Sequence, residues 1–158
     1  MPCLESIIKS ENNNVIGVVT QPDKPKGRGH KLQPTPVKAK AVEYNIPVFQ
    51  PETLKNRSFE DELKQLNPDI IVVVAYGQIL PEYILNFPKF GCINVHASLL
   101  PKYRGAAPIQ WSIINGDTTT GVTTMYMAKS LDTGDMIRKA EIQIGDEESA
   151  GELHDRSV

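Results

Sequence analysis

The chain has 158 residues with 17 basic and 19 acidic side chains, a net charge of −2, and 40% hydrophobic residues. This length and composition suit one globular domain with a hydrophobic core. No apolar run reaches the roughly 18 residues of a membrane helix, and the N-terminus lacks the layout of a signal peptide. We therefore expect no membrane association and a soluble compartment, either the cytoplasm or an organelle interior. Cys3 and Cys92 lie outside any metal-binding or CxxC spacing, which argues against a disulfide framework or a metal site.

Helices and strands alternate along the first half of the chain. The helices are predicted from the spacing of Leu4, Ile7 and Ile8, from Thr35 followed by Pro36 with an end near Asn45, and from a capping box of Ser58 and Asp61 with an end near Leu66. The strands are predicted at 15–20, 46–49 and 69–75. The run 69–75 is almost uniformly aliphatic, which is typical of a parallel strand buried on both faces.

The same alternation continues in the second half of the chain. The predicted elements are a short helix after Pro81, a strand at 91–98, a helix at 106–115, strands at 121–128 and 136–144, and a helix capped by Ser149 and Glu152. The turn 131–135 is short enough to join its two strands in an antiparallel pair. The whole pattern predicts an α/β fold with an open, mostly parallel, Rossmann-like sheet flanked by helices.

Basic residues are concentrated between residues 21 and 40. This window holds six basic residues and one acid, a net charge of +5 in a chain that is negative overall. A local positive patch on an acidic body favours a face that meets phosphates. On charge alone, a solvated loop explains the window equally well.

Polar side chains alternate on the strand predicted at 91–98. Asn94, His96 and Ser98 would project to one face, at the carboxyl end of a parallel strand, where open α/β sheets bind their ligands. An amide and an imidazole side by side can stabilise negative charge on a carbonyl oxygen, as acyl transfer requires. The structural alternative is a capping asparagine and a histidine whose hydrogen bonds are satisfied at a strand end.

Asp132 lies in the turn after the next strand and could reach His96, fixing its tautomer and stabilising its cation. Alternatively, Asp132 only shapes the turn, as Asp and Gly commonly do. Two other motifs are weaker. Ser98 lies in no G-x-S-x-G elbow, which argues against a hydrolytic triad with His96 and Asp132. The Asp-Thr-Gly at 132–134 resembles an aspartic protease turn, but only a dimer would supply the second carboxylate.

The run 94–101, followed by 102–108, closely resembles the folate-dependent formyltransferase family, and 131–135 resembles the second signature of that family. The resemblance covers essentially the whole chain. The loop 21–29 is similar to one found in the branch that formylates methionyl-tRNA. The resemblance implies transfer of a formyl group from 10-formyltetrahydrofolate to the α-amine of methionine on initiator tRNA, in translation initiation. The alternatives are a formyltransferase for a small amine and a non-catalytic folate- or RNA-binding remnant.

The resemblance also implies roles for individual residues. Asn94 and His96 would hold the oxyanion formed on the formyl group, and Asp132 would orient His96 and assist proton transfer. The implied folate-binding residues are Ser98, Leu99, Leu100, Pro101, Tyr76, Gly77, Gln78, Ile79 and Leu80. The implied tRNA-binding residues are Arg28, Lys24, Lys26 and Lys31. On composition alone, Leu99 and Leu100 suit plain core packing equally well.

Family members normally begin with a strand and a glycine-containing turn, and they end with a β-barrel domain that binds tRNA. We therefore expect residues 1–158 to form a catalytic domain that lacks the first strand, is incomplete at both ends and is without the barrel. We also expect a monomer. Between strands 15–20 and 69–75, the absent strand would leave backbone hydrogen-bonding groups unpaired.

Overall fold

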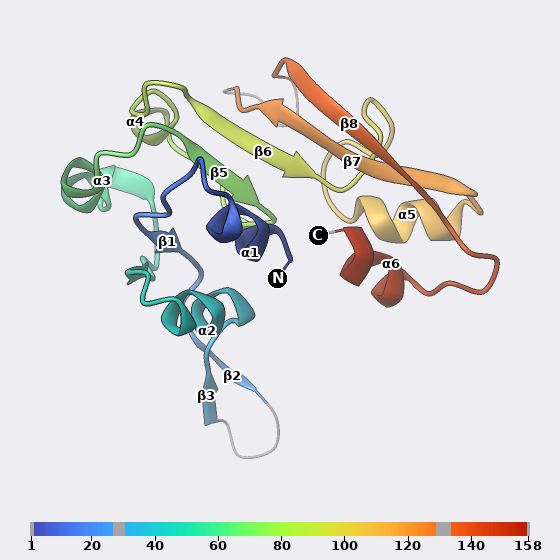
Figure 1. The fold of residues 1–158 in the computed structure, drawn as a ribbon, viewed down its shortest axis with the longest axis horizontal. Helices are drawn as coiled ribbons and strands as arrows, with labels where there is room; N and C mark the ends of the chain where they lie inside the picture. Colours follow the sequence, from blue (N-terminus) through green and yellow to red (C-terminus); the bar gives the residue numbers. More distant parts are fainter. Residues whose placement is uncertain (1, 27–30, 129–133, 158) are drawn as a thin grey trace. The chain divides into compact units, whose positions relative to one another are not determined.

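The computed structural model describes residues 2–26, 31–128 and 134–157. By its contacts the chain divides into two compact units, one formed by Met1–Pro68 and Gln78–Ile84 and the other by Asp69–Gly77 and Leu85–Val158. Both units combine helices with strands (Figure 1), and the predicted α/β class is confirmed. Within the residues described, no helix is long and apolar enough to cross a membrane.

The first unit is built around a short parallel pair of strands. Its elements are α1 (Pro2–Lys9), β1 (Val18–Val19), β2 (Lys24–Lys26), β3 (Lys31–Gln33), α2 (Pro36–Glu43), β4 (Val48–Phe49), the 3-10 turn η1 (Lys55–Arg57) and α3 (Glu60–Leu66), with α4 (Glu82–Leu85) after Pro81. β1 pairs with β4 in parallel, and β2 pairs with β3 as an antiparallel hairpin. The sequence predicted no strands in the basic window, so this hairpin is an addition.

The predicted start of α2 is confirmed. Thr35 is the N-cap, its side-chain oxygen accepts a hydrogen bond from the Lys38 backbone N–H at 3.2 Å, and Pro36 occupies the first helical turn. The capping box predicted from Ser58 and Asp61 is wrong. The N-cap of α3 is Phe59 without a side-chain hydrogen bond, because the Ser58 hydroxyl instead donates to the Thr53 carbonyl oxygen at 2.6 Å.

The second unit holds a four-stranded sheet in the order β5-β6-β7-β8. Its elements are β5 (Ile71–Val74), β6 (Cys92–His96), α5 (Pro108–Ile114), β7 (Thr119–Tyr126), β8 (Met136–Gln143) and α6 (Ala150–Ser157). β5 and β6 are parallel, and β6 and β7 are antiparallel. β7 and β8 are also antiparallel, as the short turn between them predicted. α5 packs on β7 and on α6 (Figure 1).

The cap predicted for α6 is confirmed as a reciprocal capping box. The Ser149 backbone N–H and hydroxyl both donate to Glu152 Oε2, at 2.9 and 2.7 Å. The Glu152 backbone N–H in turn donates to the Ser149 hydroxyl at 3.4 Å. These bonds satisfy donors that the first helical turn cannot pair internally.

Gly121 on β7 lies against two neighbouring segments. A methyl group at this position would collide with the Ala140 carbonyl oxygen on β8 and lie 2.6 Å from Leu99 Cδ2. A backbone oxygen inside a ladder cannot move aside as a flexible side chain can. The absence of a side chain at Gly121 therefore lets the segment after β6 pack directly on the β7–β8 pair.

We expect Gly121→Ala to lower the free energy of unfolding by about 2 to 3 kcal/mol, because overpacking forces the backbone to shift. Urea denaturation of the parent and the variant measures this difference. Gly151→Ala is the matched control, since its nearest neighbouring atom, Ser149 Oγ, is 3.9 Å away and α6 is exposed there. Equal stability of the Gly121→Ala and Gly151→Ala proteins would contradict the expectation.

Candidate functional site

The carboxyl ends of β5 and β6 lie at one edge of the second unit's sheet. Their parallel register pairs Val74 with Val95, so the segments that follow the two strands leave the sheet side by side. Ala75 and Gly77, with φ of 44° and 81°, turn the chain after β5. This edge brings Tyr76 and Gly77 to the same end of the sheet as the predicted site on β6.

Asn94 and His96 lie two residues apart on β6, so their side chains share one face of the sheet. Their cross-strand partners on β7 are Met125 and Thr123. Met125 and Thr123 are almost completely buried, at 1% and 0% exposure, and His96 is 7% exposed. The polar pair therefore lies in a largely desolvated layer, where hydrogen bonds and charges act more strongly than in water.

The imidazole of His96 is oriented by a backbone carbonyl. Its Nε2 lies 2.9 Å from the carbonyl oxygen of Tyr103. A carbonyl oxygen can only accept, so the proton of the hydrogen bond belongs to Nε2. In the neutral ring the lone pair is consequently on Nδ1.

The segment from Ser98 to Tyr103 is held by side-chain hydrogen bonds from its own residues and from β7 and β8. The Ser98 hydroxyl donates to the Lys102 carbonyl oxygen at 2.7 Å. The Thr123 hydroxyl donates to the Ser98 carbonyl oxygen at 2.7 Å and accepts from the Leu100 N–H at 3.1 Å. Lys139 on β8 donates to the Leu100 carbonyl oxygen. Four hydrogen bonds thus fix the turn at Ser98, Leu100 and Lys102.

The predicted folate-binding residues of this turn differ in exposure. Leu100 is 2% exposed, Ser98 is fully buried, Leu99 is half-buried and Pro101 is exposed. Leu100 therefore packs in the core, and Leu99 and Pro101 are the side chains that a ligand could touch. Burial and the hydrogen bond to Lys102 also make Ser98 unfit as a nucleophile, which agrees with the rejection of a hydrolytic triad.

Cys92 opens β6 and is 2% exposed. Burial raises the pKa of its thiol to about 11. The thiolate is therefore scarce near neutrality, so Cys92 acts as a small buried hydrophobic residue rather than as a nucleophile.

The base of the β2–β3 hairpin in the basic window is fixed by charged and polar contacts. Asp23 accepts from Lys38 Nζ at 2.6 Å and from Gln50 Nε2 at 2.7 Å. The hydrogen bond from Lys38 has the larger effect and the one from Gln50 the smaller, and together they hold the pKa of the Asp23 carboxyl below its usual range. Lys24 Nζ donates to Gln21 Oε1 at 3.0 Å. The chain is thereby anchored where it enters and leaves the hairpin.

Several predicted site residues lie outside what the structure describes. Asp132 and Arg28 fall in the undescribed segments 129–133 and 27–30, and Lys26 and Lys31 are described in backbone only. Gln78, Ile79 and Leu80 continue from Tyr76 and Gly77, but they cluster with the first unit. Leu80 is buried at 8% exposure, whereas Ile79 is 78% exposed.

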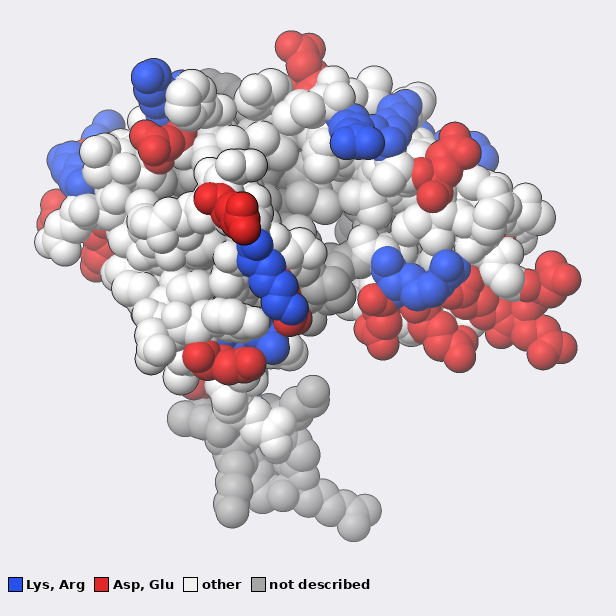
Figure 2. Space-filling view, viewed as in Figure 1, with Lys and Arg blue, Asp and Glu red and all other residues white. Residues whose placement is uncertain are grey.

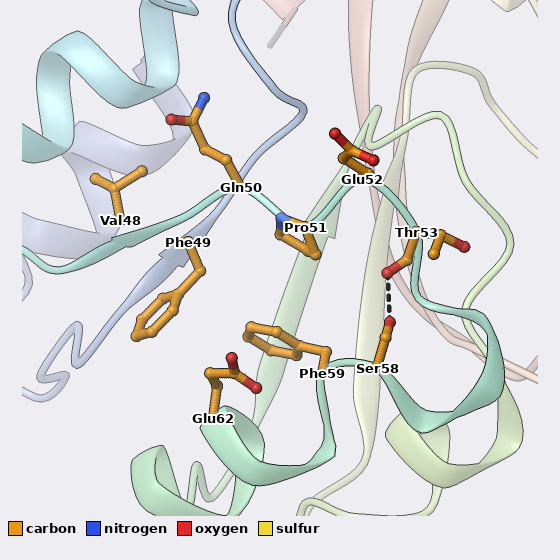
Figure 3. Close-up of a pocket in the computed structure, with 9 residues that line it drawn as sticks. All are labelled: Val48, Phe49, Gln50, Pro51, Glu52, Thr53, Ser58, Phe59 and Glu62. Atoms are coloured by element: carbon orange, nitrogen blue, oxygen red, sulfur yellow. Dashed lines mark hydrogen bonds between the residues drawn. The ribbon is translucent and has the colours of Figure 1, made fainter.

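A depression of about 520 Å³ lies in the first unit, beside β4 (Figure 3). Phe49 and Phe59 face it with an edge-to-face contact, their ring centroids 5.7 Å apart. Its lining residues are Val48, Phe49, Gln50, Pro51, Glu52, Thr53, Ser58, Phe59 and Glu62. None of these residues was predicted for the site.

Among the residues described, no group of three His, Cys, Asp or Glu side chains is placed to hold a metal ion.

The residues that organise the turn after β6 were not predicted from the sequence. Thr123 could have been found from the register of an antiparallel pair, which places it opposite His96. Lys139 and the Tyr103 carbonyl gave no pattern, because their contacts depend on the path of the turn.

The chain was compared with known proteins. The family model described as formyl transferase matches residues 2–158. A methionyl-tRNA formyltransferase of Alkaliphilus oremlandii is 65% identical over 156 residues, 99% of this chain and 50% of the relative, and one of Clostridioides difficile is 64% identical over 158 residues, 100% and 51%. The chain thus spans about half the length of these curated relatives. A phosphoribosylglycinamide formyltransferase structure from Bacillus halodurans has a TM-score of 0.77 at 24% identity, covering 97% of this chain and 80% of that one, which shows a shared fold.

Proposed function

Because the chain belongs to the formyl transferase family, we propose that it carries the catalytic site of an enzyme that formylates the α-amine of methionine on initiator tRNA, with 10-formyltetrahydrofolate as the donor. The single observation that supports this best is the pair Asn94 and His96 on one face of β6, at the carboxyl edge of the sheet. The methionyl-tRNA formyltransferases at 64–65% identity support the choice of acceptor.

The reaction needs little activation of its nucleophile. An α-amine has a pKa of roughly 8, so an appreciable fraction is neutral near pH 7. The amine nitrogen attacks the formyl carbon, the bond from that carbon to the folate nitrogen breaks, and one amine proton leaves. Asn94 and His96 would stabilise the oxyanion during the attack, and Asp132 would orient His96 and assist the proton transfer.

The donor would lie along the two segments that follow β5 and β6. A flat heterocycle suits an apolar wall with backbone polar groups, which the half-buried Leu99 and exposed Pro101 could supply together with Tyr76 and Gly77. Gln78, Ile79, Leu80, Ser98 and Leu100 complete the set proposed for folate binding. For the buried Ser98 and Leu100 the contact would be through the backbone.

The tRNA would bind through the basic window. Lys24, Lys26, Arg28 and Lys31 carry four positive charges on or between β2 and β3, and the anchored base of this hairpin limits the entropy lost on binding. Acidic side chains, in contrast, gather around α6 (Figure 2), where Glu147, Glu148, Glu152 and Asp155 surround Arg156. This acidic surface would repel a polyanion. The protein would act as a monomer that does not bind a membrane, in the cytoplasm or an organelle interior.

We expect formyl transfer to methionyl initiator tRNA to be far more salt-sensitive than transfer to a small amine. Two to four phosphate contacts predict a fall in kcat/KM on the order of ten- to a hundred-fold between 50 and 200 mM salt. The reason is that binding releases counterions from the tRNA, and this release is less favourable at higher salt. The measurement is kcat/KM of the full-length protein over a series of salt concentrations, with a methionine ester as the small acceptor.

Transfer to the ester should stay within about two-fold across the series, since it lacks the phosphates. A preference for the ester, or salt-independent transfer to tRNA, would instead favour an enzyme of small amines. Binding of folate and tRNA with no transfer to either acceptor would favour a non-catalytic remnant.

A further inference from the structure

The side chain of Tyr103 is anchored at the end of α5. Its hydroxyl donates a hydrogen bond to Asp117 Oδ2 at 2.8 Å and accepts one from Asn115 Nδ2 at 2.9 Å. Lys102 Nζ lies 3.6 Å from the other oxygen of Asp117. The hydroxyl therefore has both a charge-assisted acceptor and a donor, the stronger kind of pairing for a phenol.

The two partners of Tyr103 are themselves fixed by the last turn of α5. The Asn115 N–H donates to the Trp111 carbonyl oxygen, and the Asp117 N–H donates to that of Ser112, both at 3.0 Å. Ser112 is fully buried. Through Asp117 and the buried Ser112, the tyrosine hydroxyl is therefore tied to the packed part of the second unit.

The backbone of Tyr103 is in the left-handed region, with φ of 54°. A bulky residue rarely adopts this conformation, and it persists only where the surroundings enforce it. At one end the hydroxyl anchor enforces it, and at the other the Ser98 hydroxyl holds the preceding carbonyl, that of Lys102. The result of this arrangement is the direction of the Tyr103 carbonyl, which points at His96 Nε2.

We propose that Tyr103 is a positioning residue for His96: its side-chain anchor fixes a carbonyl that keeps the proton of the neutral ring on Nε2 and makes Nδ1 the reacting nitrogen. The catalytic part of this inference rests on the proposed function. In that reaction Nδ1 takes the proton that leaves the attacking amine, and the resulting cation donates from Nδ1, first to the oxyanion and then, by releasing the proton, to the departing folate nitrogen. Nε2 stays on the Tyr103 carbonyl throughout, so the ring does not have to turn.

The test reads the tautomer of His96 directly. In the intact protein, two-bond ¹H–¹⁵N correlation spectra distinguish a protonated from an unprotonated ring nitrogen, and His96→Gln assigns the signals. We expect neutral His96 to carry its proton on Nε2. In Tyr103→Phe, the ratio of the Nε2–H to the Nδ1–H form should fall about five-fold, the factor that one ordinary hydrogen bond is worth. Asp117→Asn, which removes the charge from the anchor, should shift the ratio in the same direction.

Tyr83→Phe is the matched control. The Tyr83 hydroxyl donates to the Leu54 carbonyl oxygen at 2.9 Å in the first unit, so this variant also loses a partly buried hydrogen bond of a phenol. It should leave the His96 signals unchanged. An Nδ1–H form in the parent protein, or parental signals in both Tyr103→Phe and Asp117→Asn, would overturn the inference. This readout needs no formyl transfer, so an inactive protein with the expected tautomer would refute the proposed function and leave the positioning role standing.

Discussion

Replacing His96 with alanine should lower kcat for formyl transfer by about a thousand-fold and leave donor binding within about three-fold. A donor aimed at a developing oxyanion in a water-poor site typically contributes 10²- to 10³-fold to kcat, and proton transfer adds to it. Binding of the ground-state donor does not use this charge, so its Kd changes little. The measurements are kcat at saturation with both substrates and titration calorimetry of the folate.

His154→Ala supplies the control for this prediction, because His154 is an exposed histidine on α6. Its kcat should equal that of the parent protein. Asn94→Ala should resemble His96→Ala, since both side chains would face the same oxygen. If His96→Ala retained a tenth or more of the parental kcat, the acyl-transfer assignment of the β6 pair would fail.

Local patterns predicted the parts of the fold whose cause is local. Thr35 with Pro36, and Ser149 with Glu152, are caps in the structure because each side chain reaches a backbone group three residues away. The alternation at 91–98 placed Asn94 and His96 on one face because successive side chains of a strand point to opposite faces. Ser58 failed as a cap because a competing acceptor, the Thr53 carbonyl, lies within reach of its hydroxyl. A spacing rule does not weigh such a competitor.

The orientation of His96 could not be predicted, because it depends on a turn rather than on a periodic element. The left-handed φ of Tyr103 leaves no trace in the sequence, since tyrosine is not a residue that favours it. The expected partner of His96, Asp132, lies outside the described residues, and within them the Tyr103 carbonyl is a partner that the sequence did not predict. A main-chain acceptor is present at every position, so no residue type singles it out.

The same limit applies to the base of the basic hairpin. Asp23 is bound by Lys38, 15 residues away, and by Gln50, 27 residues away. The number of charges in the sequence indicates the positive window, but it does not indicate that Asp23 and Lys38 are in contact. Within the window, Lys38 is paired with Asp23 and Lys40 with Glu43, and a charge count does not show which basic residues are paired.

Asp132→Asn should lower kcat by about a hundred-fold in the parent protein and by less than about three-fold in a protein that already carries His96→Ala. The proposed carboxylate would act on the reaction through the cationic form of His96, so its effect should vanish with the imidazole. The side chain of asparagine keeps the size and loses the charge. Four kcat values, from the parent, the two single variants and the double variant, measure the coupling.

Asp135→Asn is the matched control in the same turn. Asp135 is exposed, and its contact with β7 is made by its backbone carbonyl, which accepts from the Tyr126 N–H at 2.9 Å. Its side-chain charge should therefore leave kcat unchanged. Additive losses for Asp132→Asn and His96→Ala would mean that Asp132 reaches the substrates directly, and a parental rate for Asp132→Asn would reduce it to a turn residue. Because the Tyr103 carbonyl holds the Nε2 proton and the Nδ1 proton would face the oxyanion, the carboxylate would stabilise the cation through its charge.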